Sequence, residues 1–387
     1  MEASSEESNA LSPTRPLRLA IAGGGTGGHV LPAIAVIAEL QRRNAVADLL
    51  WIGSDGGLER EAALRARIPF SSIPTGKLRR YLSLRNVLDA VRVPLGVAAS
   101  RRLLRRFRPD VVFSTGGFVS VPTVAASVGV APVLTHEQTA ILGLATRLDA
   151  RFAAILAISY DQTRPEASKL HRRVMVTGNP VRPELSLGSR ADGMKRFGFD
   201  PGMPLIYVTG GARGASPINQ RVARLLPELL EDTQILHQTG PAAANADAAA
   251  LADLRRSLPE RLQRRYQVIE FIGDELPDVY AATDLVLGRA GAGTIAELAY
   301  VGKPAILIPL PGAGGDEQAV NARVLGNVGA AAVLPQTDAT PERLRAEILA
   351  ILRDDNRRAR MAAAARTVSR PDAAARLADA LVSLAGR

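Results

Sequence analysis

Gly-Gly-Gly-Thr-Gly-Gly-His-Val occupies residues 23–30, between an apolar run, Leu17–Ala22, and a helix-forming stretch, Pro32–Leu40. A strand, a tight glycine turn and a helix N-terminus in this order point bare backbone N–H groups at an anion. His29 adds a titratable ring where it can face the bound ligand. The stretch therefore predicts the start of a Rossmann-like α/β domain whose first loop binds an anion and takes part in chemistry.

Strand-like runs alternate with helical stretches along the rest of the chain, which predicts parallel sheets covered by helices on both faces. At 387 residues the chain is too long for one ordinary core. We therefore predict two doubly wound α/β domains with a ligand cleft between them. The predicted strands are Leu17–Ala22, Leu49–Ile52, Val111–Ser114, Val133–His136, Ala154–Ile158, Leu205–Thr209, Gln234–Gln238, Val268–Phe271, Leu285–Leu287, Ala305–Ile308 and Ala331–Leu334.

A segment rich in turn-forming residues, Val176–Pro183, separates the two halves, and Pro204–Ala215 repeats the order of strand, glycines and helix. We predict a disordered tail over residues 1–16, an N-terminal domain over 17–178 and a C-terminal domain over 179–370. Residues 371–387 are predicted to form a helix, and their sequence leaves open whether this helix returns to the first domain.

Composition excludes several kinds of site. The chain has no cysteine, which rules out disulfides, thiolate catalysis and zinc–thiolate sites. Its four histidines show no metal-ligand spacing, so we expect neither a metal nor a cofactor. Every apolar run is broken well before the roughly 20 residues of a membrane span. Residues 1–16 contain no hydrophobic signal segment, and we expect the protein to stay in the cytoplasm.

The formal charge of +10 is concentrated in one segment. Apolar residues at near-helical spacing interleave there with the charges, which is typical of an amphipathic segment on anionic lipid. A solvated helix face is the alternative. Nucleic acid is not expected as a partner, because aromatic residues make up only 4% of the chain and no nucleic-acid-binding module is visible. The basic residues are Lys77, Arg79, Arg80, Arg85, Arg92, Arg101, Arg102, Arg105, Arg106 and Arg108, against a single acid, Asp89.

Gly23, Gly25 and Gly28 also fit the pattern G-x-G-x-x-G, so a dinucleotide site is an alternative for the first loop. That site requires an acidic residue near the end of the second strand to hold a ribose, and Asp55 is the candidate.

A second glycine-rich cluster, Gly288–Glu297, follows the predicted strand Leu285–Leu287 and leads into a helix predicted to begin at Ile295. Its N–H groups and helix dipole can hold a diphosphate without a metal. Glu297, expected in the first turn of that helix, either caps it or accepts bonds from ribose hydroxyls. Gln318 and Asn321 lie three residues apart on one helix face and can read sugar hydroxyls.

The two loops together predict a group transfer. The second half offers more glycine-lined loops, so we place a nucleotide diphosphate there and a different anionic substrate at residues 23–29.

Several motifs now occur in an order that is similar to one known family. They are T-G-G-H-V-L-P-A at 26–33, P-T-G-K-L-R-R at 74–80, H-E-Q at 136–138, G-N-P-V-R at 178–182, and Gln318 with Asn321 and Ala322. The chain resembles the bacterial cell-wall glycosyltransferases that add N-acetylglucosamine to undecaprenyl-diphosphate-linked muramyl-pentapeptide. The resemblance extends from Leu17 to about residue 370. It implies a GT-B fold, a UDP-N-acetylglucosamine donor and an inverting transfer at the cytoplasmic face of the cell membrane.

The resemblance also implies roles for single residues. Glu297 would hold the donor ribose and Gln318 the donor sugar, while Thr26, Gly27, Gly28 and His29 would face the acceptor diphosphate and the reacting centre. The remaining implied substrate-binding positions are Thr139, Arg182, Ala212, Ile272, Arg289, Ala292, Gly293, Thr294, Ile295, Ala296 and Asn321. This chain departs from the family pattern at Phe118, Thr139 and Thr146, which leaves the identity of the acceptor open. It also has Ala212 where the family has serine, which removes one hydroxyl that would contact the donor diphosphate.

We predict His29 and Glu297 as the catalytic residues, with His29 as general base or acceptor-positioning group, because its ordinary pKa suits a base at neutral pH. The alternative is that its ring only hydrogen-bonds a diphosphate or a loop carbonyl. His136 and Glu137 are neighbours on a strand and point to opposite faces, so at most one faces the cleft. His171 and His237 are expected to have no role in the reaction.

A lipid-linked acceptor favours the membrane interpretation of the basic segment. The residues predicted to contact the membrane are Lys77, Arg79, Arg80, Leu82, Leu84, Arg85 and Leu88. Three alternatives to the whole assignment stay open: a GT-B transferase with another lipid-linked acceptor, a non-hydrolysing sugar-nucleotide epimerase, and a catalytically silent sugar-nucleotide-binding or membrane-scaffold protein.

Overall fold

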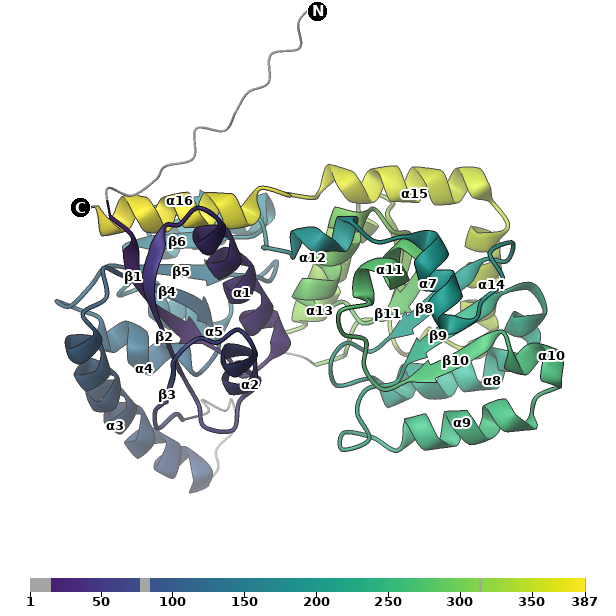
Figure 1. Ribbon diagram of the computed structural model, residues 1–387, viewed down its shortest axis with the longest axis horizontal. Coiled ribbons are helices and arrows are strands. Elements are labelled where there is room, and N and C mark those ends of the chain that lie inside the picture. The colour runs from purple at the N-terminus through teal and green to yellow at the C-terminus, as the bar shows by residue number, and fades with distance from the viewer. Residues whose placement is uncertain (1–14, 77–83, 313–314, 387) are drawn as a thin grey trace, which may run out of the picture. The chain divides into compact units, whose positions relative to one another are not determined.

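The computed structural model (Figure 1) describes residues 15–76, 84–312 and 315–386, and the side chains of residues 84–91 are not part of this description. The chain divides into two compact units, residues 1–180 with 370–387, and residues 181–369. Each unit is a parallel sheet with helices on both faces, so the predicted pair of doubly wound α/β domains is confirmed.

The first unit contains a seven-stranded parallel sheet in the order β3-β2-β1-β4-β5-β6-β7. Successive residues of β1 point to opposite faces, so each face has its own core. Leu19 and Ile21 pack with one group of helices, and Ala20 and Ala22 with another. The strands are β1 (Leu17–Gly23), β2 (Val46–Gly53), β3 (Phe70–Ser72), β4 (Val111–Gly116), β5 (Val133–Glu137), β6 (Ile155–Ile158) and β7 (Val174–Val176).

Helix α1 (Gly27–Arg42) and the last helix, α16 (Ala373–Ala385), cover the Leu19 face together. Leu377 and Leu381 of α16 are fully buried in this core. The Arg43 guanidinium also lies 2.5 Å from the Asp379 carboxylate. Residues 370–387 therefore belong to the first unit, although they follow the second in sequence.

Helices α3 (Leu84–Phe107) and α4 (Ser120–Ala126) cover the other face, where Leu104 and Val124 are buried. The remaining helices of this unit are short: α2 (Leu58–Arg65), α5 (Leu144–Asp149), the 3-10 helix η1 (Asp161–Thr163) and α6 (Arg164–Leu170). Among the described residues, no helix combines the length and the apolar character needed to cross a bilayer.

The second unit contains a six-stranded parallel sheet in the order β10-β9-β8-β11-β12-β13. Its strands are β8 (Leu205–Thr209), β9 (Gln234–Gln238), β10 (Tyr266–Ile269), β11 (Leu285–Gly288), β12 (Ala305–Leu307) and β13 (Ala331–Val333). Its helical segments are η2 (Pro183–Ser186), α7 (Arg190–Phe197), α8 (Ser216–Asp232), α9 (Asp247–Ser257), α10 (Glu260–Gln263), α11 (Leu276–Ala282), α12 (Ala292–Val301), α13 (Glu317–Gly326), α14 (Pro341–Leu352) and α15 (Asp355–Thr367).

Three strand predictions need correction. Strands β3 and β7, which have three residues each and lie at the two edges of the first sheet, were not predicted, and Val176 of β7 was expected in a turn-rich segment. Strand β10 begins at Tyr266, two residues before the predicted Val268. Edge strands of three residues pair along one side only and are too short to show a periodic pattern, so their sequence signal is weak.

In both sheets the strand order reverses next to the first strand of the unit, between β1 and β4 and between β8 and β11. Loops that leave the carboxyl ends of such neighbouring strands run in opposite directions and open a crevice, which is the usual ligand site of doubly wound sheets. The glycine-rich loops after β1 and after β11 both lie at these points.

Candidate active-site loops

The first glycine loop leads directly into α1. Thr26 has extended backbone angles, φ −144° and ψ 158°, and the helix begins at Gly27 rather than in the predicted stretch Pro32–Leu40. Gly27, Gly28 and His29 therefore form the first turn of α1. The Thr26 hydroxyl oxygen lies 2.9 Å from His29 Nδ1 and fixes the ring at the mouth of the loop.

A buried carboxylate fixes the conformation of this loop through hydrogen bonds. Glu59 of α2 is fully buried and accepts hydrogen bonds from Gly25 N at 2.9 Å, Ser54 N at 2.9 Å and Ser54 Oγ at 2.5 Å. The expectation that the loop's N–H groups are bare is therefore wrong for Gly25. Among the described residues, the Gly27 and Gly28 N–H groups have no acceptor, because they open the helix, and they remain for a ligand.

The glycines also allow close packing inside the loop. A Cβ on Gly23 would lie 2.0 Å from Thr115 Oγ1, and a Cβ on Gly24 would lie 2.2 Å from the Glu59 carboxyl carbon. At Gly25 the φ of +86° favours glycine, and a Cβ there would lie 3.0 Å from the Phe118 ring. The first two glycines thus serve contacts within the protein.

The turn after β4 forms the opposite wall of the His29 environment. Gly116 and Gly117 have φ of +80° and +81°, respectively. A Cβ on Gly117 would lie 3.3 Å from His29 Nδ1, and one on Gly116 would lie 3.7 Å from His29 Cδ2. The loops of β1 and β4 therefore meet at the imidazole, as the reversal in strand order predicts.

The electrostatic setting keeps His29 neutral. Burial lowers the pKa of His29 below its ordinary value, while the negative charge of Glu137, the Gly24 backbone and the charge of Glu59 act in the opposite direction. A neutral imidazole is able to take up a proton at neutral pH. The site therefore offers a base next to helix N–H groups.

The segment after β5 is held by Glu137, which is buried. Its carboxylate accepts hydrogen bonds from Thr139 N at 3.1 Å, Thr139 Oγ1 at 2.7 Å and Gly143 N at 2.8 Å. The Thr139 hydroxyl, predicted to bind substrate, thus contacts this carboxylate and lies 2.5 Å from Ile141 O. Thr146 is buried nearby.

The other three histidines contact the protein itself. His136 Nε2 lies 3.0 Å from Gly178 O, and burial lowers the pKa of His136 to about 4. His237 lies between the Tyr266 hydroxyl at 2.9 Å and Asn219 Oδ1 at 3.0 Å, and burial lowers its pKa to about 3. His171 contacts the carbonyls of Arg173 and Ala153.

In the second unit, α12 begins at Ala292, directly after Gly291 in extended conformation. The prediction that this helix begins at Ile295 is wrong, and so is the placement of Glu297 in its first turn. Glu297 lies in the second turn, too far along the helix to cap it. Ala292 and Ile295 are buried, whereas Gly293, Thr294 and Ala296 are partly exposed. Nothing lies within 4 Å of the position of a Cβ on Gly293.

Glu297 belongs to a cluster with Tyr280 of α11 and Arg182, which precedes η2. The Tyr280 hydroxyl donates to Glu297 Oε2 at 2.8 Å. Burial raises the pKa of Glu297, and the charge of Arg182 acts against this rise. Arg182 Nε is buried and has no hydrogen-bond partner among the described residues. A carboxylate and a guanidinium with unused donors and acceptors are suited to a polar ligand.

Three predicted donor contacts shape the loops of the second unit. Arg289 is 6% exposed and donates to Ile308 O at 2.9 Å, Pro309 O at 3.1 Å and Gln336 Oε1 at 2.6 Å. Burial, followed by the charge of Arg221, lowers the pKa of Arg289. Gln318 Oε1 accepts from Leu310 N at 3.0 Å, and Asn321 Nδ2 donates to Ala290 O at 3.3 Å.

The remaining predicted positions lie at the same carboxyl edge of the second sheet. Ile272 is buried after β10. Ala212 is exposed in the turn after β8, between Gly211 and Gly214, which have φ of +76° and +71°.

Asp55, the acid that a dinucleotide site would require, forms an ion pair with Arg60 at 2.7 Å, and its side chain is 79% exposed. The acid that reaches the glycine loop is Glu59, and backbone donors occupy it. This arrangement does not favour a dinucleotide. Among the described residues, no group of three or more histidine, aspartate or glutamate side chains is placed to hold a metal ion.

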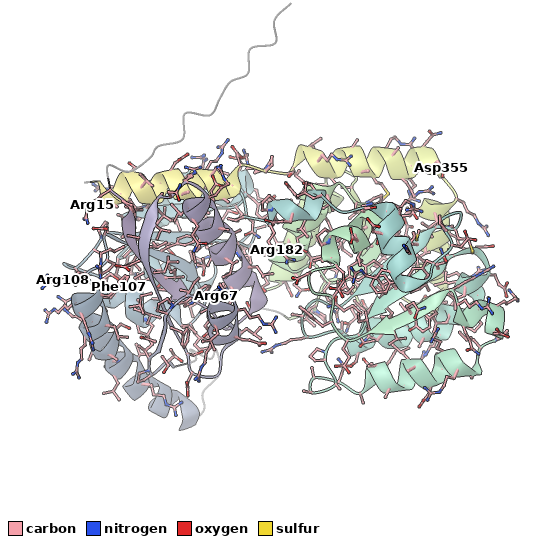
Figure 2. All side chains as sticks on the ribbon, viewed as in Figure 1. Arg15, Arg67, Phe107, Arg108, Arg182 and Asp355 are labelled. Carbon is pink, nitrogen blue, oxygen red and sulfur yellow. The ribbon has the colours of Figure 1, made fainter. Side chains whose placement is uncertain are left out.

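Most of the residues predicted to contact a membrane lie outside the described part of the chain. These are Lys77, Arg79, Arg80 and Leu82; Leu84, Arg85 and Leu88 lie on α3, where only the backbone is described. The described end of α3 borders an open hollow of about 700 Å³, and Figure 2 labels Arg15, Phe107 and Arg108 on this side of the unit. It is lined by Arg15, Arg18, Arg105, Arg106, Arg108 and Asp110.

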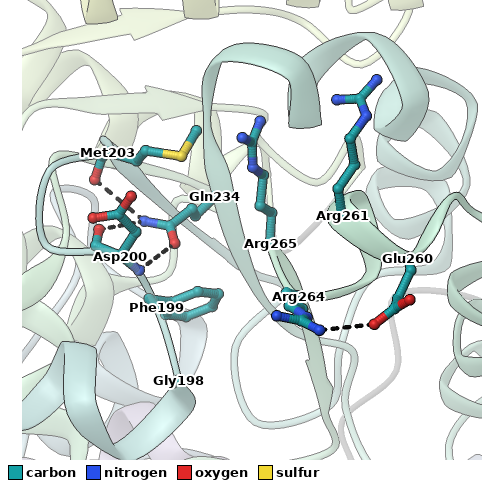
Figure 3. Close-up of a pocket in the computed structure, with 9 residues that line it drawn as sticks. All are labelled: Gly198, Phe199, Asp200, Met203, Gln234, Glu260, Arg261, Arg264 and Arg265. Carbon is teal, nitrogen blue, oxygen red and sulfur yellow. Dashed lines mark hydrogen bonds and ion pairs between the residues drawn. The ribbon is translucent and has the colours of Figure 1, made fainter.

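A second hollow, of about 590 Å³, lies in the second unit (Figure 3). Gln234 opens β9, so this hollow is at the amino ends of the strands and away from Glu297. Its polar groups pair with each other: Gln234 accepts from Asp200 N at 2.6 Å, and Arg264 donates to Glu260 at 2.7 Å. We do not assign it to the candidate site.

Comparison with known proteins matches two family models. Residues 19–158 match the glycosyltransferase family 28 N-terminal domain, and residues 205–377 match the glycosyltransferase family 28 C-terminal domain. A relative from Listeria welshimeri is 38% identical over 371 residues, which are 95% of this chain and 99% of the relative. It is named UDP-N-acetylglucosamine–N-acetylmuramyl-(pentapeptide) pyrophosphoryl-undecaprenol N-acetylglucosamine transferase.

Two solved structures are similar in fold. The crystal structure of Acinetobacter baumannii MurG has a TM-score of 0.73 and 28% identity, covering 94% of this chain and 98% of that one. A putative UDP-N-acetylglucosamine 2-epimerase from Listeria monocytogenes has a TM-score of 0.63 and 16% identity, covering 93% of both chains. At that identity the second likeness concerns the fold alone.

Two side chains of the candidate site, Glu59 and Tyr280, were not predicted from the sequence. Glu59 follows Gly56-Gly57 at the start of a helix, where an acid favours the helix dipole, but its partners lie up to 34 residues away. Tyr280 stands in an ordinary amphipathic helix. Only the fold brings these side chains to the loops.

The role of Glu59 can be tested by replacing it with glutamine. In Glu59→Gln one acceptor oxygen becomes an amide N–H that faces donors, so we expect the free energy of unfolding of the first unit to fall by about 1–3 kcal/mol. Urea unfolding can be followed through Trp51, the chain's one tryptophan, whose Nε1 donates to Gly23 O at 3.0 Å.

The matched control is Glu61→Gln on the same helix, where the side chain is 61% exposed and pairs with Arg65. We expect it to change the unfolding free energy by less than about 0.5 kcal/mol. Equal effects of the two substitutions would contradict the structural role of Glu59.

Proposed function

The chain belongs to glycosyltransferase family 28, and on this premise we propose that it transfers N-acetylglucosamine from UDP-N-acetylglucosamine to undecaprenyl-diphosphate-linked muramyl-pentapeptide in peptidoglycan synthesis. The observation that carries this proposal is the 38% identity to a named N-acetylglucosamine transferase over 95% of the chain, which includes both units. The separate chemistry of the two loops supports it, because a transferase needs one site for a nucleotide and one for an acceptor.

The second unit is proposed to hold the donor. The N–H groups of Gly293 and Thr294 open α12 and have no carbonyl one turn earlier, so they can bind the donor diphosphate. Glu297 is proposed to accept hydrogen bonds from the ribose hydroxyls while Tyr280 orients its carboxylate at 2.8 Å. Arg182 supplies a cation for the charge that develops on the leaving UDP.

Arg289, Gln318 and Asn321 are proposed to shape this donor site. Arg289 and Gln318 hold residues 308–310 of the loop after β12, and Asn321 holds Ala290 before α12. Ala212 and Ile272 contribute backbone and apolar surface at the same edge of the sheet.

The first unit is proposed to hold the acceptor. Its diphosphate would lie at the Gly27 and Gly28 N–H groups, where the dipole of the 16-residue helix α1 favours an anion. Because Thr26 Oγ1 contacts His29 Nδ1, the ring can carry its hydrogen there and present Nε2 as the base.

The bonds formed and broken in the proposed transfer balance as follows. His29 Nε2 takes the proton of the muramyl hydroxyl while that oxygen forms its bond to the anomeric carbon of the sugar. The bond from this carbon to the diphosphate oxygen breaks, and its electron pair leaves with UDP. Attack from the side opposite the leaving group inverts the anomeric centre.

The proposed activity predicts release of UDP only when both substrates are present. Purified protein with UDP-N-acetylglucosamine and the undecaprenyl-diphosphate muramyl-pentapeptide should form UDP and a disaccharide lipid in equal amounts. UDP-N-acetylmannosamine or free UDP formed without acceptor would indicate an epimerase instead, and donor binding without any product would indicate a silent binding protein. Turnover with a different lipid-linked sugar alone would overturn the acceptor assignment.

His29 is tested in the same assay. We expect His29→Ala to lower kcat by about 10²–10⁴, the usual contribution of a general base, with little change in the KM for the donor. The control is His171→Ala, whose ring contacts backbone groups of Arg173 and Ala153 in the same unit. Near-normal kcat at saturating substrates in His29→Ala would refute the base assignment.

Glu297 is predicted to act through donor binding. Glu297→Gln should raise the KM for UDP-N-acetylglucosamine about tenfold to a hundredfold, the equivalent of a hydrogen bond to a charged group, and leave kcat nearly unchanged. Glu260→Gln, an exposed residue of α10, is the control. A fall in kcat with an unchanged KM would show that Glu297 acts on the transition state rather than on the ribose.

We propose that the basic segment 77–108 brings the enzyme to the anionic cytoplasmic face of the cell membrane. The described support is the hollow at the end of α3. Arg15 pairs with Asp110 at 2.5 Å, and Arg18 donates to Phe107 O at 2.7 Å. Arg105, Arg106 and Arg108 are exposed and form no ion pair with any described residue, so their charges are available to lipid headgroups.

Removing these three charges should weaken membrane binding. We expect the triple variant Arg105→Gln, Arg106→Gln, Arg108→Gln to bind vesicles containing phosphatidylglycerol about a hundredfold more weakly at low salt, at about 1 kcal/mol for each charge. Binding of the wild type should fall as salt is raised. The control removes three exposed arginines of the second unit, Arg256, Arg264 and Arg360. Equal losses in both variants would contradict a localised docking surface.

A further inference from the structure

Asp149, the last residue of α5, is a buried acid that the proposed mechanism does not use. Its Oδ2 accepts hydrogen bonds from Ser114 Oγ at 2.9 Å and Ser120 Oγ at 2.6 Å. Its Oδ1 is buried with no hydrogen-bond partner among the described residues. An ionisable group in this condition is costly to keep unless it has a role.

The two serines flank the turn that contacts His29. Ser114 lies on β4, and its Oγ accepts from Gly116 N at 3.2 Å. Ser120 opens α4, and its Oγ lies 2.9 Å from Gly117 O. Asp149 is therefore connected through one hydroxyl to each glycine of the turn, and a Cβ on Gly117 would lie 3.3 Å from the His29 ring.

The Ser120 hydroxyl has one hydrogen and two acceptors within reach. When Asp149 is ionised, this hydrogen points to the carboxylate at 2.6 Å, and Gly117 O keeps only the hydrogen bond from Ser120 N at 3.0 Å. When Asp149 carries a proton, the carboxyl O–H donates to Ser120 Oγ, and the serine hydrogen turns to Gly117 O. The charge of Asp149 thus decides how firmly the turn is held.

Because of its surroundings, Asp149 is expected to gain or lose its proton near neutral pH. The pKa of Asp149 is raised to about 7: burial and, to a smaller extent, the charge of Glu137 on β5 raise it, and the hydrogen bonds from Ser120 and Ser114 act in the opposite direction. The titratable groups that act on the turn and on His29 from neighbouring elements are Glu137 of β5 and Glu59 of α2, whereas β4 and α4 contribute hydroxyls and no charged side chain.

We propose that Asp149, acting through Ser114 and Ser120, is a positioning residue that holds the Gly116–Gly117 turn against His29 and loosens it when ionised. Its effect on turnover rests on the proposed role of His29 as base. Its effect on the turn itself does not, so the two parts can be tested separately.

The test independent of activity is an NMR titration of the His29 ring in the full-length protein. We expect the His29 ring signals to show, besides their own titration, a second inflection near pH 7 that disappears in Asp149→Asn, because the amide cannot titrate. Persistence of this inflection in Asp149→Asn, or its absence in the wild type, would overturn the proposal even if the enzyme is a transferase.

Activity supplies the second readout. In Ser120→Ala we expect kcat to fall about fivefold to tenfold, as for a small misplacement of a catalytic group, with an unchanged KM for UDP-N-acetylglucosamine. Asp149→Asn should keep most of its kcat, because its amide N–H can donate to Ser120 Oγ as the protonated carboxyl does. Asp149→Asn should nevertheless lose the pH dependence of kcat near pH 7. If Asp149→Asn does not fold, Ser120→Ala keeps the test open, because it removes only one hydroxyl.

Ser127→Ala is the matched control for Ser120→Ala. Ser127 is buried directly after α4, at the end away from the turn, and its Oγ donates to Thr123 O at 2.8 Å. We expect Ser127→Ala to leave kcat and its pH profile as in the wild type. Equal kcat losses in both serine variants would mean that the effect comes from α4 stability, which overturns the proposal. No UDP release by the wild type would remove the proposed function but leave the NMR test intact.

Discussion

Glu59 places a carboxylate beneath the first glycine loop, and the first unit's site depends on the three hydrogen bonds that this carboxylate accepts. They tie the loop after β1 to the loop after β2, so the chain leaves β1 in one conformation. The glycines at 23 and 24 are needed because Thr115 and Glu59 fill the space that side chains would occupy. Only then does α1 begin at Gly27, with its N–H groups and His29 on the ligand side. The Glu59 carboxylate thus binds the N–H group of Gly25, while the N–H groups of Gly27 and Gly28 remain for an anionic substrate.

In the second unit a buried cation, rather than a carboxylate, fixes the loops at the ligand-binding edge of the sheet. Arg289 follows β11 and donates to two carbonyls of the loop after β12 and to Gln336. Carbonyl groups gather at the carboxyl ends of parallel strands, and a guanidinium with five donors can satisfy several of them at once. Gln318 and Asn321 fasten the neighbouring loops in the same way. The ligand-facing groups are then the start of α12 and the cluster of Glu297, Tyr280 and Arg182. Both units therefore use buried polar side chains to fix loops and helix N-termini to receive ligands.

The parts that sequence reasoning reached are those with local causes. Central strands such as Leu205–Thr209 are continuous apolar runs because helices cover both sheet faces. The glycine loops are recognisable from their composition alone. The features that were not predicted depend on contacts between residues distant in sequence. Nothing near Glu59 shows that it will meet Gly25, and nothing near Asp149 shows Ser114, 35 residues earlier. The start of α12 was misplaced because Ala292 and Gly293 read as loop residues, although the extended Gly291 lets the helix begin before them. Composition and periodicity thus predict the scaffold, whereas the supports of the site follow from tertiary packing.

Three buried carboxyl groups surround the His29 loop, and they differ in how well they are satisfied. Glu59 and Glu137 each accept three hydrogen bonds, at least two of them from backbone N–H groups that cannot move away. Asp149 accepts two, both from serine hydroxyls that can rotate, and one of its oxygens has no partner among the described residues. Fixed N–H donors stabilise a carboxylate charge, whereas rotatable hydroxyls accommodate either protonation state. Burial raises the pKa of Asp149 to about 7, and its two serine donors can rotate to accommodate the change of charge without rebuilding the loops.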